Sequence, residues 1–250
     1  MLTTMLTLML LTGSPESDDI RSAYTLLQTG INRFDETTLL KAINRFDSLS
    51  ERQPGNGQAL IGAGWARYQL GTYYMTRKMG DKVTDSYDAN MKVAEKLSEV
   101  KGFEADGLVL KAAITMNKLS VSGGASAALL SFKIHGWLDE AEDLRPDHPR
   151  LHLIRGMMYF FTPAMFGGSA EKALSFFTQS VKSFEAVARQ APPADHLGFA
   201  ESCAWAAQAE FKLGNGDSAR KWCERALSIQ PDYGMIRQRL LPMINEKFPE

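Results

Sequence analysis

The sequence lacks a strong excess of charge of either sign. Its 250 residues include 28 Lys and Arg against 29 Asp and Glu, so the formal net charge is −1. A protein that binds nucleic acid or an anionic membrane over a broad surface usually carries a clear excess of basic residues. The composition therefore predicts no nucleic-acid partner, and any partner has to be recognised by a local surface.

Long hydrophobic runs are also scarce. Beyond the first eleven residues, no stretch approaches the roughly 18 apolar residues that a membrane-spanning helix needs. Met1 to Leu11 carries no charge and has the length of the apolar part of a secretory signal. We therefore expect residues 1–17 to be a degenerate signal or linker and residues 18–250 to be a single helical domain that is periplasmic or otherwise exported. A cytoplasmic protein with a buried or disordered N-terminal segment is the alternative.

Motifs of catalysis and metal binding are missing as well. The sequence contains no Gly-x-Ser-x-Gly, no Cys-x-x-Cys and no His-Glu-x-x-His, which are spacings that nucleophilic, redox and zinc chemistry use. His148 and His152 are four residues apart, but Pro149 places a helix start between them. We predict no catalytic residues, no metal and no cofactor. The protein is expected not to be an enzyme, with an enzyme of unrecognised site as an alternative.

What the sequence does contain is helical periodicity, which begins after a short linker, Ser14 to Ser17, and does not give way to the alternation of strands. Small residues and prolines recur at intervals of 12 residues. The recurring positions are Gly30, Ala42 and Pro54 near one end and Ala207, Ala219 and Pro231 near the other. Small residues let two antiparallel helices approach closely, and Pro ends the second helix. Gly64 follows Gly30 by 34 residues, a period typical of tetratricopeptide repeats.

These patterns predict an all-α fold, a tetratricopeptide-like helical-repeat superhelix of about five antiparallel helix pairs and a C-terminal capping helix. The pairs are expected near 18–52, 57–100, 103–145, 149–190 and 195–229, and the capping helix from Tyr233 to about Lys247. The terminal repeat of an open stack needs a polar outer face, which is the role expected for the last helix.

The clearest of these pairs runs from Arg150 to Phe184, and its turn is five residues longer than that of a regular repeat. Gly-Gly before a helix start could hold an anion. The simpler interpretation is that the glycines supply the backbone angles of the turn and Ser169 caps the next helix. The turn is expected to be a site if it folds into the groove of the superhelix, and only a hinge if it caps the outer edge. Its characteristic residues are Thr162, Pro163, Phe166, Gly167 and Gly168.

The region from Asp147 to Ser169 resembles a group of bacterial, mostly exported tetratricopeptide-like proteins. The matching motifs are His148-Pro149-Arg150, where the group has Asn-Pro-Arg; Gly156 to Tyr159 within a helix; Thr162-Pro163-Ala164-Met165-Phe166-Gly167-Gly168; and Lys172-Ala173. The resemblance covers this region well and most of the remaining chain loosely. It implies a fold and export, because members of the group are largely without an assigned activity.

A second, more distant resemblance is to the periplasmic T-component associated with tripartite substrate-binding transporters. Its helical-repeat fold carries a similar Gly-Gly turn. This resemblance implies a transport accessory with a ligand pore and an oligomeric assembly, which we keep as an alternative.

The inner groove of the superhelix is the remaining candidate site, because the first helix of each pair lines the groove in such stacks. The groove-facing positions hold mainly aromatic residues, with Met and Arg: Tyr24, Trp65, Arg67, Tyr68, Arg150, Met157, Phe160 and Phe211. Rigid aromatic side chains with a few Arg are typical of contact surfaces, and Met adapts to varied partners. We therefore hypothesise a scaffold that binds a peptide or protein partner in this groove. Core packing between repeats is the alternative for each of these residues.

Two cysteines, Cys203 and Cys223, are expected to face each other across an antiparallel helix pair. In an exported protein, a disulfide between them would close a loop of about 20 residues and add roughly 3 kcal/mol of stability. Two buried free thiols that act as small hydrophobic residues are the favoured interpretation.

Overall fold

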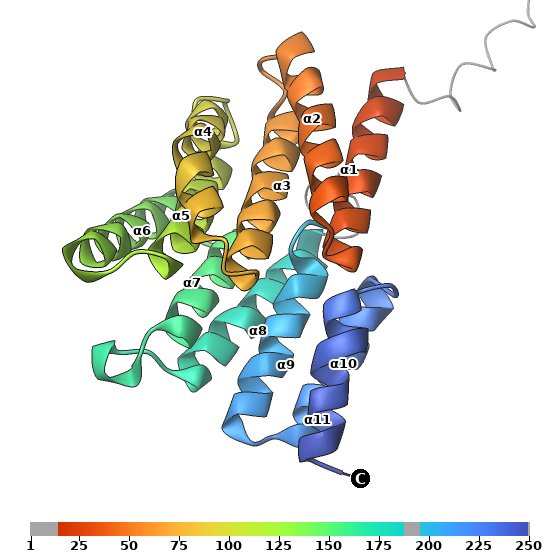
Figure 1. The fold of residues 1–250 in the computed structure, drawn as a ribbon, viewed down its shortest axis with the longest axis vertical. Helices are drawn as coiled ribbons and strands as arrows, with labels where there is room; N and C mark the ends of the chain where they lie inside the picture. Colours follow the sequence, from red (N-terminus) through yellow and green to blue (C-terminus); the bar gives the residue numbers. More distant parts are fainter. Residues whose placement is uncertain (1–14, 188–195, 250) are drawn as a thin grey trace, which may run out of the picture.

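The computed structural model describes residues 15–187 and 196–249, and most of them are helical, with no strand among them. The helices form five antiparallel pairs that are stacked into a curved array (Figure 1). The pairs are α1 (Pro15–Arg33) and α2 (Glu36–Arg52), α3 (Gly57–Thr76) and α4 (Gly80–Ser98), α5 (Glu104–Ser120) and α6 (Gly124–Leu144), α7 (Pro149–Phe161) and α8 (Ala170–Val187), and α9 (Phe199–Leu213) and α10 (Gly216–Ile229). A 3₁₀ turn (Ala164–Phe166) joins α7 to α8, and a π-helical turn (Ile236–Leu240) leads into α11 (Leu241–Lys247). The predicted helix pairs and capping helix are confirmed.

The first helix begins earlier than the sequence predicted. Residues 15–17 were expected in a linker, but α1 begins at Pro15, and Pro is well tolerated at the first position of a helix because its missing N–H has no partner there. Residues 1–14, which carry the predicted signal segment, lie outside the described residues. None of the described helices is long and apolar enough to cross a membrane.

Small residues allow the helices to approach closely, as the 12-residue spacing predicted. A Cβ atom on Gly64 would lie 2.0 Å from Leu110, and one on Gly156 would lie 2.5 Å from Phe177. Ala42, with no exposed surface, lies in the core. Because a clash of this size has to be relieved by moving a buried neighbouring side chain or its helix, these positions need a small side chain.

The junctions between successive pairs are not all alike. The second helix of a pair packs closely on the first helix of the next pair at three junctions, α2 on α3, α4 on α5 and α8 on α9. At the fourth junction, α6 has few contacts with α7. Figure 1 shows the two helices diverging toward one edge of the molecule. The stack is therefore interrupted between the third and fourth pairs.

The curvature of the stack brings the last pair back beneath the first, so that α10 lies below α1 in Figure 1. Gln230, at the end of α10, donates a hydrogen bond to Asn32 in α1. Nearer the centre, Gln69 in α3 donates to Glu201 in α9 at 3.0 Å. The inner faces of α3, α7 and α9 consequently share one core, and the superhelix is more tightly closed than an open stack.

Candidate functional site

Most of the residues predicted to line the inner groove lie in the core. Five of them, Tyr24, Trp65, Tyr68, Arg150 and Met157, are buried, and three, Arg67, Phe160 and Phe211, are partly buried. The rings of Trp65 and Tyr68 are 5.1 Å apart, and the Tyr68 hydroxyl lies 3.6 Å from the sulfur of Met157. Tyr24 packs edge-on against Phe46. These buried residues therefore pack neighbouring repeats together, as the alternative interpretation expected.

The remaining predicted groove residues are spread along the molecule. Arg67 is paired with Asp47 at 2.7 Å and lines a small pocket between α3, α4 and α5. Phe160 packs against Trp205. Phe211 lies at the far end of α9, where it meets Phe248. The structure therefore does not bring the eight residues together as one surface.

The inner face contains a carboxyl group that the sequence reasoning missed. Glu201 in α9 accepts a hydrogen bond from Gln69, and burial raises the pKa of its carboxyl to about 7, although hydrogen bonding acts in the opposite direction. Glu201 is the one acidic residue in the otherwise apolar first half of α9. An acidic residue among apolar residues on one face of a predicted helix was the signal in the sequence that could have identified Glu201.

A buried polar cluster fixes the start of α7 against α5. Asp106 in α5 accepts hydrogen bonds from Arg150 at 2.5 Å and from His148 Nε2 at 3.0 Å, and all three side chains are buried. Burial alone would raise the pKa of Asp106, but the Arg150 guanidinium and His148 hold it well below its usual range. The polar groups of this cluster satisfy one another, which leaves them a structural role.

His148 has the position that Pro149 predicted for it, before the helix and away from His152. Its Nδ1 accepts the backbone N–H of Leu151, so His148 is the N-cap of α7. Burial lowers the pKa of His148, so the neutral ring can accept at Nδ1 and donate to Asp106 from Nε2. No group of three or more His, Cys, Asp or Glu in the described parts of the chain is close enough to hold a metal ion.

Arg155 connects α7 to the C-terminal half of α6. Its guanidinium donates to the carbonyl of Leu138 at 3.1 Å and to the carboxylates of Asp139 at 2.9 Å and Glu142 at 2.7 Å. One helical turn before it, His152 is buried near the ring of Phe176, and burial lowers its pKa to about 4. These contacts hold α7 to its neighbours near its N-terminal end.

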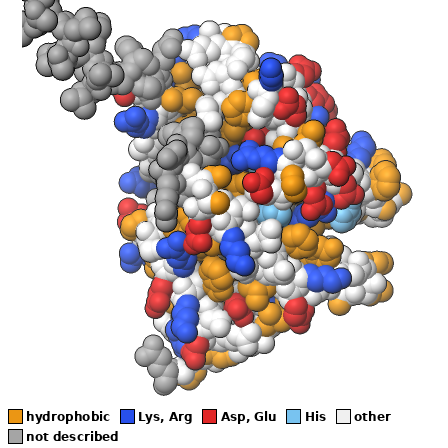
Figure 2. All heavy atoms as spheres, turned by 180° about the vertical axis from the view of Figure 1, so that it is seen from behind, with side chains coloured by type: hydrophobic (Ala, Val, Ile, Leu, Met, Phe, Trp, Pro, Cys, Tyr) orange, Lys and Arg blue, Asp and Glu red, His pale blue; other side chains and the backbone are white. Residues whose placement is uncertain are grey.

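Beyond Arg155 the two helices separate, and the space between them is bounded by aromatic side chains. Helical spacing places Ala128, Phe132 and His135 on the same face of α6 as Asp139, and all three are exposed. On the opposite side, the rings of Tyr159 in α7 and Phe176 in α8 are stacked 5.4 Å apart. We call this space the notch. Figure 2 shows the molecule hollowed at one edge, with hydrophobic side chains on both sides of the hollow.

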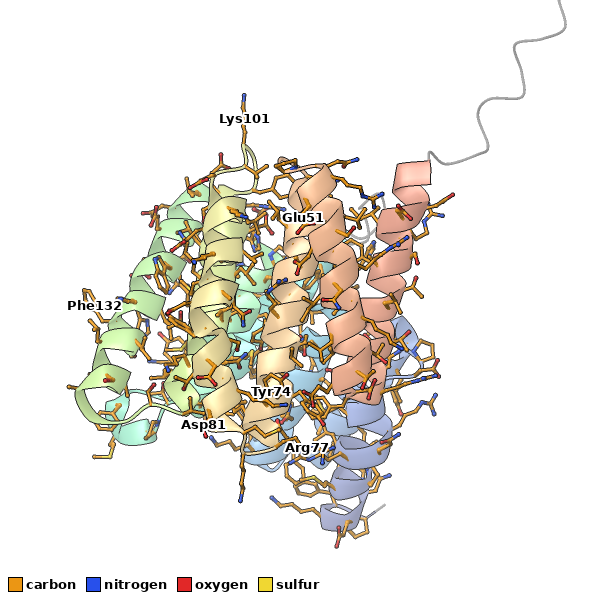
Figure 3. All side chains as sticks on the ribbon, turned by 45° about the horizontal axis from the view of Figure 1, so that its top comes forward. Glu51, Tyr74, Arg77, Asp81, Lys101 and Phe132 are labelled. Atoms are coloured by element: carbon orange, nitrogen blue, oxygen red, sulfur yellow. The ribbon has the colours of Figure 1, made fainter. Side chains whose placement is uncertain are left out.

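The notch lies within the part of the molecule that exposes most apolar surface. The large hydrophobic residues that are exposed are Leu40, Val121, Leu129, Phe132, Leu144, Phe161, Met165, Phe166 and Met243. Seven of these nine fall between Val121 and Phe166, that is, from the end of α5 to the turn after α7. Figure 3 shows Phe132 projecting from α6 away from the body of the molecule. The sequence predicted α6 as a helix but not its exposed apolar face. Apolar residues occupy both faces of α6, and only one of these faces packs on α5, so the other is uncovered.

The long turn between α7 and α8 contributes to this surface. Met165 is 83% exposed and Phe166 is 73% exposed, so the turn caps the outer edge and does not fold into the inner face. Gly167 has a φ of +90°, and a Cβ on Gly168 would lie 1.7 Å from the carbonyl oxygen of Thr162. Only glycine fits either position without strain.

The turn does not form an anion site. The backbone N–H of Gly167 donates to Ala164, that of Gly168 donates to Pro163, and that of Ser169 donates to Tyr159. These donors are therefore not available to a ligand. Ser169 accepts the backbone N–H of Lys172 at 3.1 Å, which is the capping role predicted for it.

Both cysteines are buried and free in the structure. Burial raises the pKa of the Cys203 and Cys223 thiols to about 12. A thiol of such a high pKa is almost entirely protonated at neutral pH and is a poor nucleophile. The two side chains pack as small hydrophobic residues between α9 and α10.

Comparisons with known proteins agree with this architecture. A family model of the tetratricopeptide repeat matches residues 167–234. The HusA haemophore from Porphyromonas gingivalis has a similar structure, with a TM-score of 0.68 and 16% identity over 80% of this chain and 96% of that chain. TTC0263, a thermophilic TPR protein in Thermus thermophilus, has a TM-score of 0.59 and 17% identity over 91% of this chain and 97% of that chain. No curated protein matches the sequence.

At identities of 16% and 17% the likeness is one of fold. The chain has a tetratricopeptide-like fold, a helical-repeat superhelix, as the sequence predicted. Folds of this class commonly serve as protein-binding scaffolds, but a fold alone does not identify a partner.

Proposed function

We propose that this repeat protein is a non-enzymatic scaffold that binds a segment of a partner protein in the notch between α6 and α7. The observation that carries the proposal is the presence of hydrophobic side chains on both sides of the notch (Figure 2), in the segment from Val121 to Phe166 that holds seven of the nine exposed large hydrophobic residues. Exposed hydrophobic residues that are scattered singly need no explanation, whereas a contiguous group of them marks an interaction surface.

The chemistry of the notch favours a protein segment as the ligand. Phe132 on one side and Tyr159 with Phe176 on the other are aromatic, and aromatic residues dominate the energetics of protein interfaces. Met165, at the outer lip, is flexible and polarizable and adapts to different side chains. The notch is open along its length, which allows a chain segment to enter from the side.

The shifted pKa values of the chain support a scaffold over an enzyme. Catalytic groups usually combine a shifted pKa with access to a substrate. Asp106 and His148 are buried in mutual hydrogen bonds, and Glu201 is bonded to Gln69 within the closed inner face. Each of these groups holds two helices together. His152, whose pKa is also shifted, lies against Phe176 beside the notch, but its ring is buried.

Site-specific photo-crosslinking in the producing cell tests the proposal. A benzophenone amino acid replaces Phe132 in one variant and Phe166 in another, and Lys101, at an exposed edge away from the notch (Figure 3), is the control position. We expect the same crosslinked protein from positions 132 and 166 and none from position 101. Equal crosslinking at all three positions would mean that the contacts are non-specific and would contradict the proposal.

The inner groove remains a second hypothesis for where a partner binds. A partner that reached Trp65 and Tyr68 would have to separate α3 from α7 and α9, because Tyr68 contacts Met157 and Gln69 is bonded to Glu201. Crosslinking from position 208, where Gln208 is a partly exposed residue of α9, tests this hypothesis in the same experiment. A partner captured there and not at position 132 would favour the groove.

Export and a role in transport are also proposals. Export is supported by the apolar segment Met1 to Leu11 and by the resemblance around Thr162 to Gly168, and fractionation of the producing cell tests it. A transport accessory of the T-component kind requires an oligomer with a pore. A strictly monomeric particle in sedimentation equilibrium would count heavily against that alternative.

A further inference from the structure

We infer that the segment bound in the notch is an amphipathic α-helix with acidic residues beside its apolar face, and that it packs along the first half of α6. This inference rests on the proposed function and specifies the partner. Four features of α6 carry it: its place in the repeat, an unexplained glycine, the size of its exposed side chains and its charge.

The place of α6 in the repeat defines what is missing. In this chain α3 packs on α2, α5 on α4 and α9 on α8. The equivalent face of α6 meets α7 only near its C-terminal end, through Arg155. At the other three junctions the corresponding face of the second helix is covered by the first helix of the next pair. On α6 the first part of this face is uncovered. An added helix would complete the packing in the way that the fold itself repeats.

Gly136 gives an independent indication that another backbone approaches α6. Glycine inside a helix costs roughly 0.5–1 kcal/mol relative to alanine. The other glycines inside the described helices are Gly30, Gly62, Gly64, Gly71, Gly107 and Gly156, and a Cβ on any of them would lie within 2.0 to 2.9 Å of a neighbouring atom. A Cβ on Gly136 would meet nothing within 4 Å. Nothing in the described chain requires glycine at this position, whereas a helix packed from outside would.

The neighbouring side chains of α6 have the sizes that close helix packing uses. Ala125 and Ala128 are small and exposed, and Leu129 and Phe132, which follow them along the helix, are large and exposed. Small residues form a groove into which the side chains of a second helix fit, and large ones enter the grooves of that helix. An extended peptide would have no need of this alternation of small and large residues along a helical face.

The charge of the notch specifies the flanks of the bound helix. From Gly124 to Leu138 the sequence of α6 contains no Asp or Glu, and its charged or titratable residues are Lys133 and His135, both exposed. Across the notch, the exposed Lys172 lies over the ring of Tyr159 at 5.5 Å. The acids of α6 begin only at Asp139, near its C-terminal end, and Asp139 and Glu142 among them are paired with Arg155. Acidic residues on the partner therefore complement this surface.

The same charges disfavour a second copy of this chain as the occupant. In a symmetric pair of α6 helices that cross near Phe132, Lys133 of one copy would lie near Lys133 of the other. Like charges across an interface oppose association. A partner of different sequence avoids this repulsion.

A selection from a displayed library of random peptides of roughly 18 residues, long enough for five helical turns, tests the inference with the full chain as bait. We expect enriched peptides to carry apolar residues at helical spacing with Asp or Glu beside them. The decisive variant is Gly136→Leu, which places a bulky side chain at the closest approach and whose Cβ meets no other atom of the chain within 4 Å. Ala89→Leu, at an exposed position of α4, is the matched control.

The enriched peptides should bind Gly136→Leu about tenfold or more weakly, since overpacking an interface costs upward of about 1.4 kcal/mol, and should bind Ala89→Leu as they bind the wild type. Enriched peptides that are extended or rich in Pro, and that lose binding to Phe132→Ala but not to Gly136→Leu, would overturn the helix and leave the proposed function intact. Peptides that bind all variants equally, or a failure of any peptide to enrich, would overturn both. A dimer in sedimentation equilibrium that dissociates in Phe132→Ala would assign the surface to a second copy and overturn the inference.

Discussion

At the junction of α8 and α9 the second helix of one pair packs closely on the first helix of the next, whereas α6 has few contacts with α7. Phe177 of α8 is completely buried, and Phe184 stacks on Phe199 across the junction at 5.3 Å. Ser180 and Ser202 share a hydrogen bond of 2.8 Å at its centre. At the α6–α7 junction the corresponding space is the notch, and Phe132 is 77% exposed.

The comparison shows that the same place in a repeat can be core or surface. The two junctions differ in how the first helix of the following pair, α9 or α7, is held in place. α9 packs on α8 through apolar side chains along the junction, while α7 is joined to α6 through the polar contacts of Arg155 and packs its own apolar side chains in the core shared with α3 and α9. Polar contacts at one end fix an angle between helices without covering their faces. The open junction is thus a consequence of where the hydrogen bonds are.

The largest expected difference between the two junctions is in stability. Phe177→Ala should lower the free energy of unfolding by about 3–5 kcal/mol, because it leaves a cavity in the core. Phe132→Ala should change it by no more than about 0.5 kcal/mol, because the side chain is exposed. Urea denaturation followed by circular dichroism measures both. A loss of more than about 1 kcal/mol in Phe132→Ala would show that α6 is covered within the chain and would break the comparison.

The Asp106 cluster should be nearly as important as the apolar junction. Asp106→Ala leaves the buried Arg150 without its carboxylate, which should cost about 3–5 kcal/mol. Asp139→Ala removes one exposed partner of Arg155 and should cost less than about 1 kcal/mol. Denaturation of both variants at neutral pH decides the matter. Equal losses would mean that the outer ion pairs hold α7 as strongly as the buried cluster does.

The same cluster predicts acid sensitivity. Because the folded pKa of Asp106 lies below its unfolded value of about 3.9, its contribution is present above that pH and is lost as the pH falls through the folded pKa. His152 adds a loss at higher pH, because its folded pKa of about 4 lies below its unfolded value and the unfolded chain therefore gains a proton first as the pH falls. Between pH 7 and pH 4 the unfolding free energy should fall more, or rise less, in the wild type than in a His152→Gln variant, because Glu201 and His148 titrate in both proteins and His152 in the wild type alone.

The inner face should show the opposite dependence on pH. Because the folded pKa of Glu201 is raised to about 7, this group favours folding less as the pH rises from its unfolded pKa through 7. Glu201→Gln keeps an acceptor for Gln69 and should stabilise the protein by about 1–2 kcal/mol at pH 8 and have little effect at pH 4. Thermal unfolding of wild type and variant at the two pH values provides the measurement. An unchanged melting temperature at pH 8 would show that the carboxyl is well solvated.

The smallest predicted effect concerns two glycines. Gly136→Ala should stabilise the chain by about 0.5–1 kcal/mol, because alanine is the better helix former and its Cβ meets open space. Gly156→Ala should destabilise it, because its Cβ would lie 2.5 Å from Phe177. Equilibrium denaturation of both variants gives the two signs. If Gly136→Ala destabilises the chain, an internal contact occupies the notch.

Much of the fold was predictable from the sequence because it depends on local signals. Helical periodicity, the small residues at the helix crossings and the capping residues His148 and Ser169 all act within a few residues of where they stand. The long turn after α7 was recognised for the same reason. Its outward direction was left open, since direction depends on the packing of α7 as a whole.

The candidate site was not predictable in the same way. The groove hypothesis assumed an open inner face, and closure depends on contacts such as Gln69 with Glu201, which are 132 residues apart. Nothing local to Trp65 or Tyr68 distinguishes an aromatic in a groove from one in a core. The exposed face of α6 was missed because its apolar residues suggest burial, and only the angle between α6 and α7 uncovers them.

The meeting of the last pair with the first has a consequence for how the chain folds. An open repeat array can gain or lose units at its ends, because each unit contacts only its neighbours. Here Gln230 bonds to Asn32, 198 residues away along the chain, and Ile31 of α1 packs against the hydrophobic cluster of α9 and α10, so the two ends of the stack touch. Such long-range contacts form only after long loops have closed, and they slow folding. We therefore expect the protein to unfold in one cooperative transition, with truncation of α10 and α11 destabilising α1 as well as α9.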